Sequence, residues 1–292
     1  MPNGSFEDFY SCPDNTQQVD SCKFWHEILN TPDYFVSCSP WPVSVPINVC
    51  GDQLPFQGNA YVGIITYDHI GFYREILGSK LSDTMTIGAT YYISIRVSRG
   101  NWTDQAWNTI ASNKLGIRFT TFEHTISSPP SINNYANVFC DTIITDTLNW
   151  VLLQWSFMAD SSYTHLYIGN FFDDANTDTV IINAPNGNEF RHAYYFIDSV
   201  NVICSSPVCL TSIQTSYATN DPLLYSSDEY LIIEIPPHIS GKFYLINLLG
   251  QIINFQNISG KSKLNMQMLP KGIYVAKIVT SQKSFSIKFV NH

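Results

Sequence analysis

Charged residues are scarce in this sequence of 292 residues: Lys, Arg, Asp and Glu make up 13% of it, whereas aromatic residues make up 14%. A disordered chain has the opposite balance, so the composition predicts a folded protein, and abundant aromatic residues are typical of half-buried β-strands. Basic residues are the scarcer kind, with 15 Lys and Arg against 24 Asp and Glu. This balance argues against a nucleic-acid-binding protein, because phosphate binding needs a basic surface.

Short motifs of several kinds of enzyme chemistry are also missing. There is no Cys-x-x-Cys and no pair of His residues four positions apart, so the ligand spacing of common zinc sites is absent. No Gly-x-Ser-x-Gly, His-Glu-x-x-His or glycine-rich phosphate loop occurs. Glycoside hydrolysis needs only two carboxylates across a cleft, which no motif reveals. We therefore predict a protein without enzymatic activity, with a glycoside hydrolase as the alternative.

Long apolar runs are absent as well, since none approaches the roughly 18 residues that span a bilayer. The Met-Pro start has neither the charged nor the apolar region of a secretory signal, so we expect that such a signal was removed from this numbering or never existed. Four of the seven cysteines fall within the first fifty residues, which is typical of disulfide-linked proteins in oxidising compartments and favours removal. At least one cysteine must stay unpaired.

The net charge changes sign along the chain and indicates two domains. Residues 1–204 hold 8 Lys and Arg against 20 Asp and Glu, a net charge of −12, whereas residues 205–292 hold 7 against 4, a net charge of +3. The segment that follows Cys204 is polar, contains Pro and Ser, and shows no helical pattern. We therefore predict a domain at 1–204, a linker at 205–228 and a second domain at 229–292.

The first domain has the pattern of a β-sandwich and no convincing helix. In Thr90–Ser98 the apolar residues Tyr91, Ile93, Ile95 and Val97 alternate with more polar ones, so one face of that strand should meet water. Before the strands, residues 11–58 are rich in Pro, Ser, Asn and Cys and predict a long loop that disulfides hold together. Other predicted strands cover Ala60–Thr66, Leu115–Thr121, Trp150–Met158, Leu166–Phe171 and Tyr194–Ile203.

The strand Tyr194–Ile203 is apolar on both faces, which predicts a strand between two covered layers. At a period of two, Phe196, Val200 and Val202 would share one face with Asp198. An unpaired buried carboxylate costs several kcal/mol, so Asp198 needs a partner. We expect that partner in the opening segment Asn3-Gly-Ser-Phe-Glu-Asp8.

The second domain also alternates as strands do. Leu264, Met266 and Met268 alternate with polar residues, and Phe285, Ile287 and Phe289 do the same. This pattern predicts a small Ig-like β-sandwich. Its strands should cover Tyr230–Ile235, Lys242–Asn247, Gln251–Phe255, Lys263–Met268, Gly272–Thr280 and Ser284–Val290.

A polar loop between Gly100 and Asn113 carries two indole rings and is the strongest candidate ligand site. A pyranose presents C–H groups on one face and hydroxyls at its edge, so it binds to a flat aromatic ring beside amide and carboxylate groups. The alternative is that one indole fills the core and the other is an ordinary surface residue. The candidate ligand-binding residues are Trp102, Trp107, Asn101, Asp104 and Gln105 in this loop.

Two further groups of polar residues have a structural and a functional interpretation. In Tyr73-Arg-Glu75 a structural ion pair is the default for Arg74, although Tyr73 and Arg74 could also bind a sugar hydroxyl or a carboxylate. The acidic cluster Asp173–Asp178 could hold a cation, but its spacing is not that of an EF-hand, so a solvated turn is the simpler interpretation.

The opening Asn3-Gly-Ser-Phe-Glu7 and the closing Asp198-Ser-Val200 resemble the ends of carbohydrate-binding modules of the galactose-binding-like jelly-roll type. The resemblance implies a large jelly roll and a structural calcium ion held by Glu7 and Asp198 with main-chain oxygens near Asn3. The chain also resembles a Bacteroidota cell-surface β domain in which the positions of Cys12 and Cys38 recur. The segments that carry this resemblance are Asn3 to Asp8, Ser11-Cys-Pro13, Thr31-Pro-Asp-Tyr-Phe35 with Cys38, Gly58-Asn-Ala-Tyr61 and Tyr73-Arg-Glu75. That resemblance implies a Cys12–Cys38 disulfide, with Cys22–Cys50 as a candidate second one; Cys204 and Cys209 are also assigned to disulfides.

The C-terminal region resembles the sorting domain of type IX secretion cargo. The residues that carry this resemblance are Leu248-Leu-Gly-Gln251, Leu269-Pro-Lys-Gly-Ile-Tyr274 and Ile287-Lys-Phe-Val290. The family's Asn-Pro at the start of the domain is replaced here by Asn220-Asp-Pro222, which blurs the boundary. The resemblance implies a secreted or surface-anchored protein that the type IX machinery recognises.

Taken with the first domain, these features predict an exported, non-catalytic protein that binds a glycan or another surface polymer. The alternative from a different class is a structural or adhesive surface protein that makes protein–protein contacts. Exposed aromatic rings on one concave face would favour the first, and a broad apolar patch would favour the second.

Overall fold

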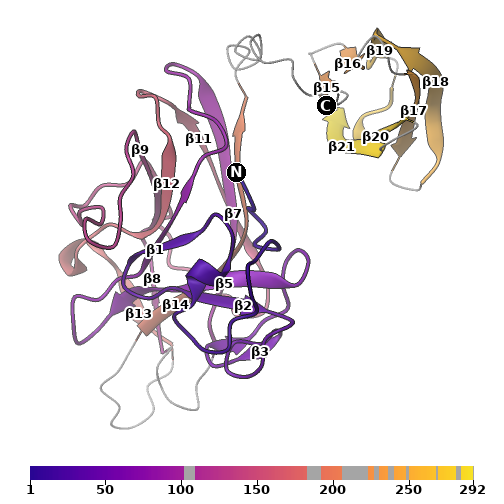
Figure 1. The fold of residues 1–292 in the computed structure, drawn as a ribbon. Helices are drawn as coiled ribbons and strands as arrows, with labels where there is room; N and C mark the ends of the chain where they lie inside the picture. Colours follow the sequence, from indigo (N-terminus) through magenta and orange to yellow (C-terminus); the bar gives the residue numbers. More distant parts are fainter. Residues whose placement is uncertain are drawn as a thin grey trace. The chain divides into compact units, whose positions relative to one another are not determined.

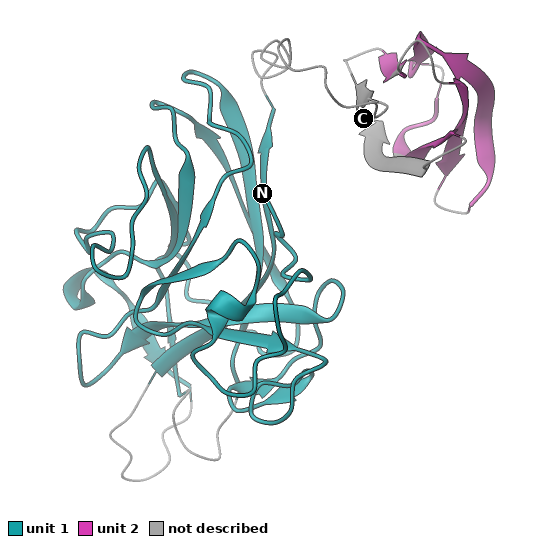
Figure 2. Ribbon diagram, in the orientation of Figure 1, with its two compact units in different colours: residues 1–212 teal, residues 213–292 magenta. Residues whose placement is uncertain are grey.

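The structure is a computed structural model, and it describes residues 1–101, 109–182, 192–205, 223–226, 230–235, 240–247, 250–267, 269–280 and 284–291. The chain forms two compact units, Met1–Ser212 and Ile213–His292 (Figure 2). The helices among the described residues are two short 3-10 turns, η1 (Val19–Ser21) and η2 (Asp174–Asn176). In the described part of the chain, no helix is long and apolar enough to cross a bilayer. The protein is therefore all-β, as the sequence predicts.

The first unit contains two antiparallel sheets of five strands each (Figure 1). Two small ladders, β3 (Ile47–Asn48) with β4 (Gly51–Asp52) and β8 (Ile110–Ser112) with β13 (Thr179–Ile181), flank them. One large sheet has the order β1 (His26–Leu29), β6 (Ile76–Lys80), β12 (His165–Asn170), β9 (Leu115–Thr120) and β10 (Val138–Phe139). The other has the order β11 (Val151–Met158), β7 (Thr90–Arg99), β14 (His192–Cys204), β5 (Ala60–Asp68) and β2 (Asp33–Val36).

The strand order is that of a jelly roll. If the eight strands β5, β6, β7, β9, β10, β11, β12 and β14 are numbered along the chain, the first lies beside the eighth and the second beside the seventh. In the same way the third strand lies between the eighth and the sixth, and the fourth between the seventh and the fifth. Two interleaved Greek keys produce this order. The predicted jelly-roll sandwich is therefore confirmed by its connectivity.

The core between the two sheets is built from alternating residues of facing strands. In β7, Ile93, Ile95 and Val97 are completely buried, as their alternation predicts. Leu115, Ile117 and Phe119 of β9 are buried in the same cluster from the opposite sheet. The apolar faces of these two alternating strands therefore pack together in one core.

The strand β14 departs from a period of two at a β-bulge. Its register with β7 shifts between Asp198 and Asn201, and Ser199 has a φ of 51°. Before the bulge Tyr195 and Ile197 face the inter-sheet core, and after it Val200 does. The sequence-based assignment of Val200 and Val202 to the face of Asp198 is therefore wrong, because the extra residue moves every later side chain to the opposite face.

The bulge is also where the opening segment of the chain attaches. The Val200 N–H donates to the Gly4 carbonyl at 2.7 Å, so the two ends of the domain pair as the sequence predicts. A Cβ atom on Gly4 would lie 2.1 Å from the Val200 carbonyl oxygen, so no larger residue fits there without a backbone shift. The closest approach of the two segments depends on this glycine.

The outer face of the β14 sheet is divided into a covered and an open half. Over β2, β5 and the first part of β14, an aromatic cluster that includes Phe35, Tyr61 and Phe196 is buried beneath residues of the 39–55 segment. Over β7 as far as Arg96, β11 and the last part of β14, the outward side chains are exposed or half-buried. Of the described residues on this face, those of the second half offer side chains to a ligand.

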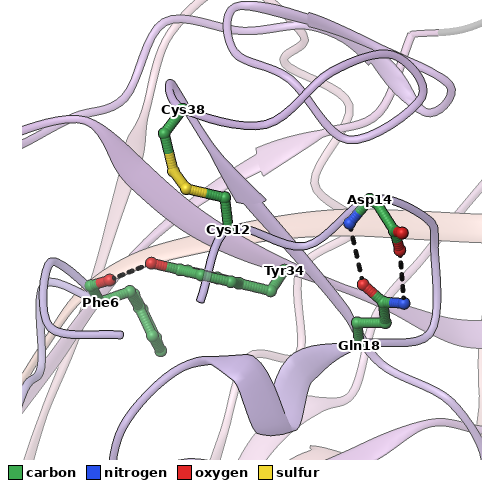
Figure 3. The surroundings of a disulfide bond; sticks show 6 residues. All are labelled: Phe6, Cys12, Asp14, Gln18, Tyr34 and Cys38. Carbon is green, nitrogen blue, oxygen red and sulfur yellow. Dashed lines mark hydrogen bonds between the residues drawn. A yellow bond between two sulfur atoms is a disulfide. The ribbon is translucent and has the colours of Figure 1, made fainter. Parts of the chain in front are cut away.

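The predicted Cys12–Cys38 disulfide is present and fastens the opening loop to the end of β2 (Figure 3). The predicted Cys22–Cys50 disulfide is wrong, since both residues are thiols. Cys22 belongs to the core between the sheets, whereas Cys50 packs into the aromatic cluster on the outer face. A sheet therefore separates the two sulfurs. Cys204 is disulfide-bonded, and Cys209 lies outside the described residues.

In the second unit, the described residues form a smaller sandwich of seven strands. One sheet has the first, second and fifth strands, β15 (Leu223–Ser226), β16 (Tyr230–Glu234) and β19 (Lys261–Asn265). The other has the order β18 (Ile252–Ser259), β17 (Ser240–Asn247), β20 (Gly272–Thr280) and β21 (Ser284–Asn291). Leu231, Phe243, Leu245 and Ile278 are completely buried between them. The predicted Ig-like sandwich is confirmed, and β15 begins inside the segment predicted as a linker.

The attachment at the bulge predicts the effect of one substitution. Gly4→Ala should lower the free energy of unfolding by more than about 1 kcal/mol, because the added methyl group meets the Val200 carbonyl. Gly71→Ala is the matched control, since a Cβ atom there would meet nothing within 4 Å. Urea unfolding of both variants measures the difference. Equal stability of the two variants would contradict the close approach of Gly4 to β14.

Candidate functional site

The residues that the sequence proposes for a ligand site are only partly placed. Trp102, Asp104, Gln105 and Trp107 lie outside the described residues. Asn101 lies just after β7, and its side-chain oxygen accepts the Asp52 N–H at 2.9 Å. A Cβ atom on Gly51 would lie 2.5 Å from that oxygen, so the amide holds the β3–β4 hairpin. The described part of this predicted site is thus a structural contact.

Arg74 is buried, and its assignment to ligand binding is wrong. The whole residue is inaccessible to solvent, and its guanidinium lies over the Tyr67 and Phe72 rings at 4.8 and 5.4 Å. It donates to Asp174 at 2.6 Å and to the Tyr73 carbonyl at 3.0 Å. Burial between two rings leaves no guanidinium surface for a ligand, and the default interpretation as a structural ion pair describes this residue.

The acidic cluster that starts at Asp173 is a capped turn. The Asp173 carboxylate accepts the Asn176 N–H at 3.0 Å and caps η2. Asp174 binds Arg74, and Asp178 accepts from the Asn113 amide at 3.0 Å. Each of these carboxylates is therefore used to fix the connection between β12 and β13. The described residues contain no group of three or more His, Cys, Asp and Glu side chains that could hold a metal ion.

Glu7 and Asp198 both accept hydrogen bonds from one short segment of the chain, residues 56–60. Asp198 Oδ2 accepts the N–H groups of Phe56 and Gln57 at 2.9 and 3.0 Å. The Glu7 carboxylate accepts those of Asn59 and Ala60 at 2.8 to 3.0 Å. We call residues 56–60 with these two carboxylates the carboxylate clamp. Asp198 thus has backbone N–H groups as partners, where the sequence suggested the opening segment.

The geometry of the carboxylate clamp depends on Gly58, and burial in the clamp raises the pKa of Asp198. Gly58 has a φ of 70°, and a Cβ atom there would lie within 2.4 Å of three atoms of the Glu7 carboxyl group. Burial raises the pKa of Asp198 to about 6, the backbone donors oppose this shift, and the charge of Glu7 adds to it. The two carboxylates are therefore close enough to repel each other.

Asn3, the third residue predicted near a calcium ion, is committed to other contacts. Its side-chain amide donates to the carbonyls of Asp8 and Lys23, and its main-chain oxygen accepts from Phe6 and Trp25. Its remaining side-chain oxygen accepts the Asp8 N–H at 3.0 Å. Asn3 therefore shapes the opening turn, and calcium at Glu7 and Asp198 stays a prediction.

The open half of the β14 sheet is a surface that the sequence did not identify as a site. We call this surface the open face. Its side chains form three rows that run across the strands. In the first row Tyr92 lies between Ser156 and Ile203, and in the second Ser94 lies between Gln154 and Asn201. In the third, Arg96 lies beside Leu152. The alternation of Thr90–Ser98 indicates the β7 part of this face, but the bulge that turns Asn201 and Ile203 outward has no sequence signal.

The open face places the aromatic ring of Tyr92 beside a central row of polar side chains. Tyr92 is 59% exposed, and hydroxyl and amide groups occupy the neighbouring positions on β7, β11 and β14. Arg96 stacks on the Phe56 ring at 4.3 Å and forms the boundary with the carboxylate clamp. The clamp therefore positions one side of the open face through Phe56, whose N–H it binds.

Comparison with known proteins identifies the second unit. Residues 227–292 match the family described as "Secretion system C-terminal sorting domain". No curated protein matches the chain. The match begins just after β15 and covers the six strands β16 to β21 of this sandwich. It confirms the sorting domain that the C-terminal motifs predict.

Several solved structures are similar in fold at low sequence identity. A Stig cyclase from Fischerella sp. TAU is 8% identical over 70% of this chain and 96% of its own, with a TM-score of 0.44. The tandem CBM22 domains of Paenibacillus barcinonensis Xyn10C are 11% identical over 97% and 85%, with a TM-score of 0.35. The adhesin domain of Epf from Streptococcus pyogenes is 12% identical over 79% and 75%, with a TM-score of 0.25. All three TM-scores lie below 0.5, and none of these similarities assigns a function.

The export route follows from the family match, because a sorting domain is the part of a cargo protein that its secretion system recognises. Residues 227–292 therefore form a secretion system C-terminal sorting domain, and the chain is a protein that the type IX system exports to the cell surface or the medium.

Proposed function

We propose that the exported body, residues 1–204, is a non-catalytic module that binds a glycan on the open face. The observation that carries this proposal is the exposed ring of Tyr92 beside Gln154, Ser94 and Asn201 on adjacent strands. A pyranose ring stacks its C–H face on such a ring, and its hydroxyls exchange hydrogen bonds with amides and hydroxyls. Because these groups stand on paired strands, they are held in place before the sugar arrives.

The arrangement of polar and apolar residues favours a glycan over a protein partner. A protein interface usually has an apolar centre and a polar rim. On the open face the polar residues Ser94, Gln154 and Asn201 form the middle row, while Leu152 and Ile203 lie in the rows on either side. The structural or adhesive alternative would need the reverse order. The net charge of −12 on residues 1–204 favours a neutral glycan over a polyanionic one.

The first test removes the ring of Tyr92. Tyr92→Ala should weaken binding of the exported protein to its glycan at least about tenfold, because the stacking surface is lost. A glycan array identifies the ligand, and calorimetry then measures the dissociation constant. Tyr10→Ala is the matched control, since Tyr10 is 71% exposed on the N-terminal loop, beneath Lys23, and belongs to none of the three strands of the open face. Equal affinity of Tyr92→Ala and the parent would exclude the open face as the site.

We also propose that a calcium ion binds at the carboxylate clamp, through Glu7 and Asp198 only. Two observations support this proposal. Glu7 Oε2 accepts a single backbone N–H and keeps a lone pair for a cation. Burial and, after it, the charge of Glu7 raise the pKa of Asp198, and a cation between the two carboxylates would offset both effects. Calcium would add oxygen coordination to a segment that backbone hydrogen bonds already hold.

A chelator tests the calcium proposal. Addition of EGTA should lower the melting temperature, and excess calcium should restore it, because an ion bound only to the native state stabilises that state. Glu7→Gln should lower the melting temperature and remove its response to EGTA. Glu123→Gln, which changes an exposed carboxylate, should keep the response. The same melting curve with and without chelator would refute the calcium site.

The sorting domain predicts the result of a truncation. Deletion of Gly272–His292 removes β20 and β21, so the four-stranded sheet loses a central strand and an edge strand. The truncated protein should accumulate in the periplasm of a Bacteroidota host, whereas the body should keep its affinity for glycan. Fractionation with a blot measures the first, and calorimetry the second. Normal export together with weakened binding would instead indicate a second binding module in tandem.

A further inference from the structure

Two carboxylates, Asp33 and Glu75, are buried together in the covered half of the β14 sheet. They are 6% and 3% exposed. The ion pairs among the described residues all involve other carboxylates, so neither Asp33 nor Glu75 forms an ion pair in that part of the chain. A pair of buried carboxylates without a cation is unfavourable when both are charged. The hydrogen bonds around them explain how this pair is accommodated.

Asp33 connects three segments that are distant in the sequence. Its Oδ2 accepts the Tyr194 hydroxyl of β14 at 2.5 Å, and its Oδ1 accepts the Gln17 N–H of the opening loop at 2.7 Å. Gly63 lies opposite Asp33 on the intervening strand β5. A Cβ atom there would lie 2.1 Å from the Tyr194 hydroxyl oxygen, so glycine gives the tyrosine its path across β5. The opening loop is thus fixed to the sheet through this carboxylate.

Glu75 does the same for the connection between β5 and β6. Its Oε2 accepts the Ile65 N–H at 2.8 Å, and its own N–H donates to the Ile65 carbonyl at 2.8 Å. Its Oε1 accepts the Tyr73 hydroxyl at 3.2 Å and the Thr31 hydroxyl at 3.4 Å. Thr31 lies two residues before Asp33, the first residue of β2, so Glu75 and Asp33 hold the same corner of the domain from two sides.

Among the residues that the structure describes, the titratable groups that face this pair carry no positive charge. Tyr194 and Cys50 lie against Asp33 from β14 and from the covering segment, and Tyr73 lies against Glu75. Arg74 lies between Tyr73 and Glu75 in the sequence, but its guanidinium donates to Asp174. Burial raises the pKa of Asp33 to about 6 against the donors Tyr194 and Gln17. Burial and then the charge of Asp33 raise the pKa of Glu75 well above its usual range.

We propose that Asp33 and Glu75 share one proton in the folded protein and form a pH-sensitive lock. When the proton is present, the pair holds the disulfide-linked opening loop and the β5–β6 connection against the sheet. When the proton is lost, two negative charges are buried at one corner of the domain without a cation among the described residues, and these two segments loosen. The lock lies under the covered half of the sheet, so it is independent of the open face and of its proposed ligand.

The direction of the pH dependence follows from the raised pKa values. A carboxyl whose folded pKa exceeds its unfolded value binds a proton more tightly in the folded state. Its contribution to stability is then fully present below the unfolded pKa values, 3.8 for Asp33 and 4.5 for Glu75, and is lost as the pH rises through the folded values. The body should therefore be more stable in mildly acidic than in alkaline solution.

Thermal unfolding of the full chain tests the proposal. The melting temperature should fall by several degrees between about pH 5 and about pH 9, and Glu75→Gln should remove most of this fall because its amide is neutral throughout. Glu123→Gln, the exposed control, should follow the parent. Parallel curves for the parent and Glu75→Gln would overturn the lock.

A second measurement covers the case in which Glu75→Gln does not fold. The infrared spectrum of the parent at neutral pH should show the carbonyl stretch of a protonated carboxylic acid, and this band should disappear at alkaline pH and in Asp33→Asn. A parent protein without this band at neutral pH would overturn the shared proton. The band together with a pH-independent melting temperature would overturn its role as a lock.

Discussion

The β-bulge at Ser199 is the feature on which the rest of the first unit depends, because it moves the later side chains of β14 to the other face of the sheet. Asp198 stays outside and binds the 56–57 segment, while Val200 enters the core and pairs with Gly4. Asn201 then turns outward onto the open face. A regular strand would place these residues on the wrong faces, so one inserted residue closes the domain and shapes its exposed surface.

The scarcity of Lys and Arg explains how the domain uses its acidic residues. With 8 basic residues for 20 acidic ones in positions 1–204, most carboxylates cannot form ion pairs. Glu7, Asp198 and Asp33 instead accept backbone N–H groups and a tyrosine hydroxyl from segments far away in sequence, and Glu75 accepts the N–H of Ile65 on the preceding strand. Each fixes a loop that has no regular structure of its own. The cost is incomplete solvation, which raises the pKa values of Asp198, Asp33 and Glu75.

Patterns that are local in the sequence predicted the structure well. The alternation in Thr90–Ser98 gave the buried and exposed residues of β7, and the motifs near the C-terminus gave the sorting domain. Contacts between distant segments were predicted less well. The Cys22–Cys50 pairing failed because a sheet separates the two thiols, and Arg74 failed as a ligand residue because Tyr67 and Phe72 enclose it. The residues next to Cys22, Cys50 and Arg74 in the sequence do not indicate these surroundings.

The sequence by itself determined that this protein is all-β, that its two domains differ in charge, and that the second directs export. These properties follow from composition, from the period of apolar residues and from short motifs, all of which can be read from residues that are close together in the sequence. The tertiary structure decided which carboxylates meet, where the sheet stays uncovered, and that Tyr92 stands beside Gln154 and Asn201. These properties depend on strand register and on a bulge, because a shift of one residue exchanges the two faces of a strand while its composition and local motifs stay the same.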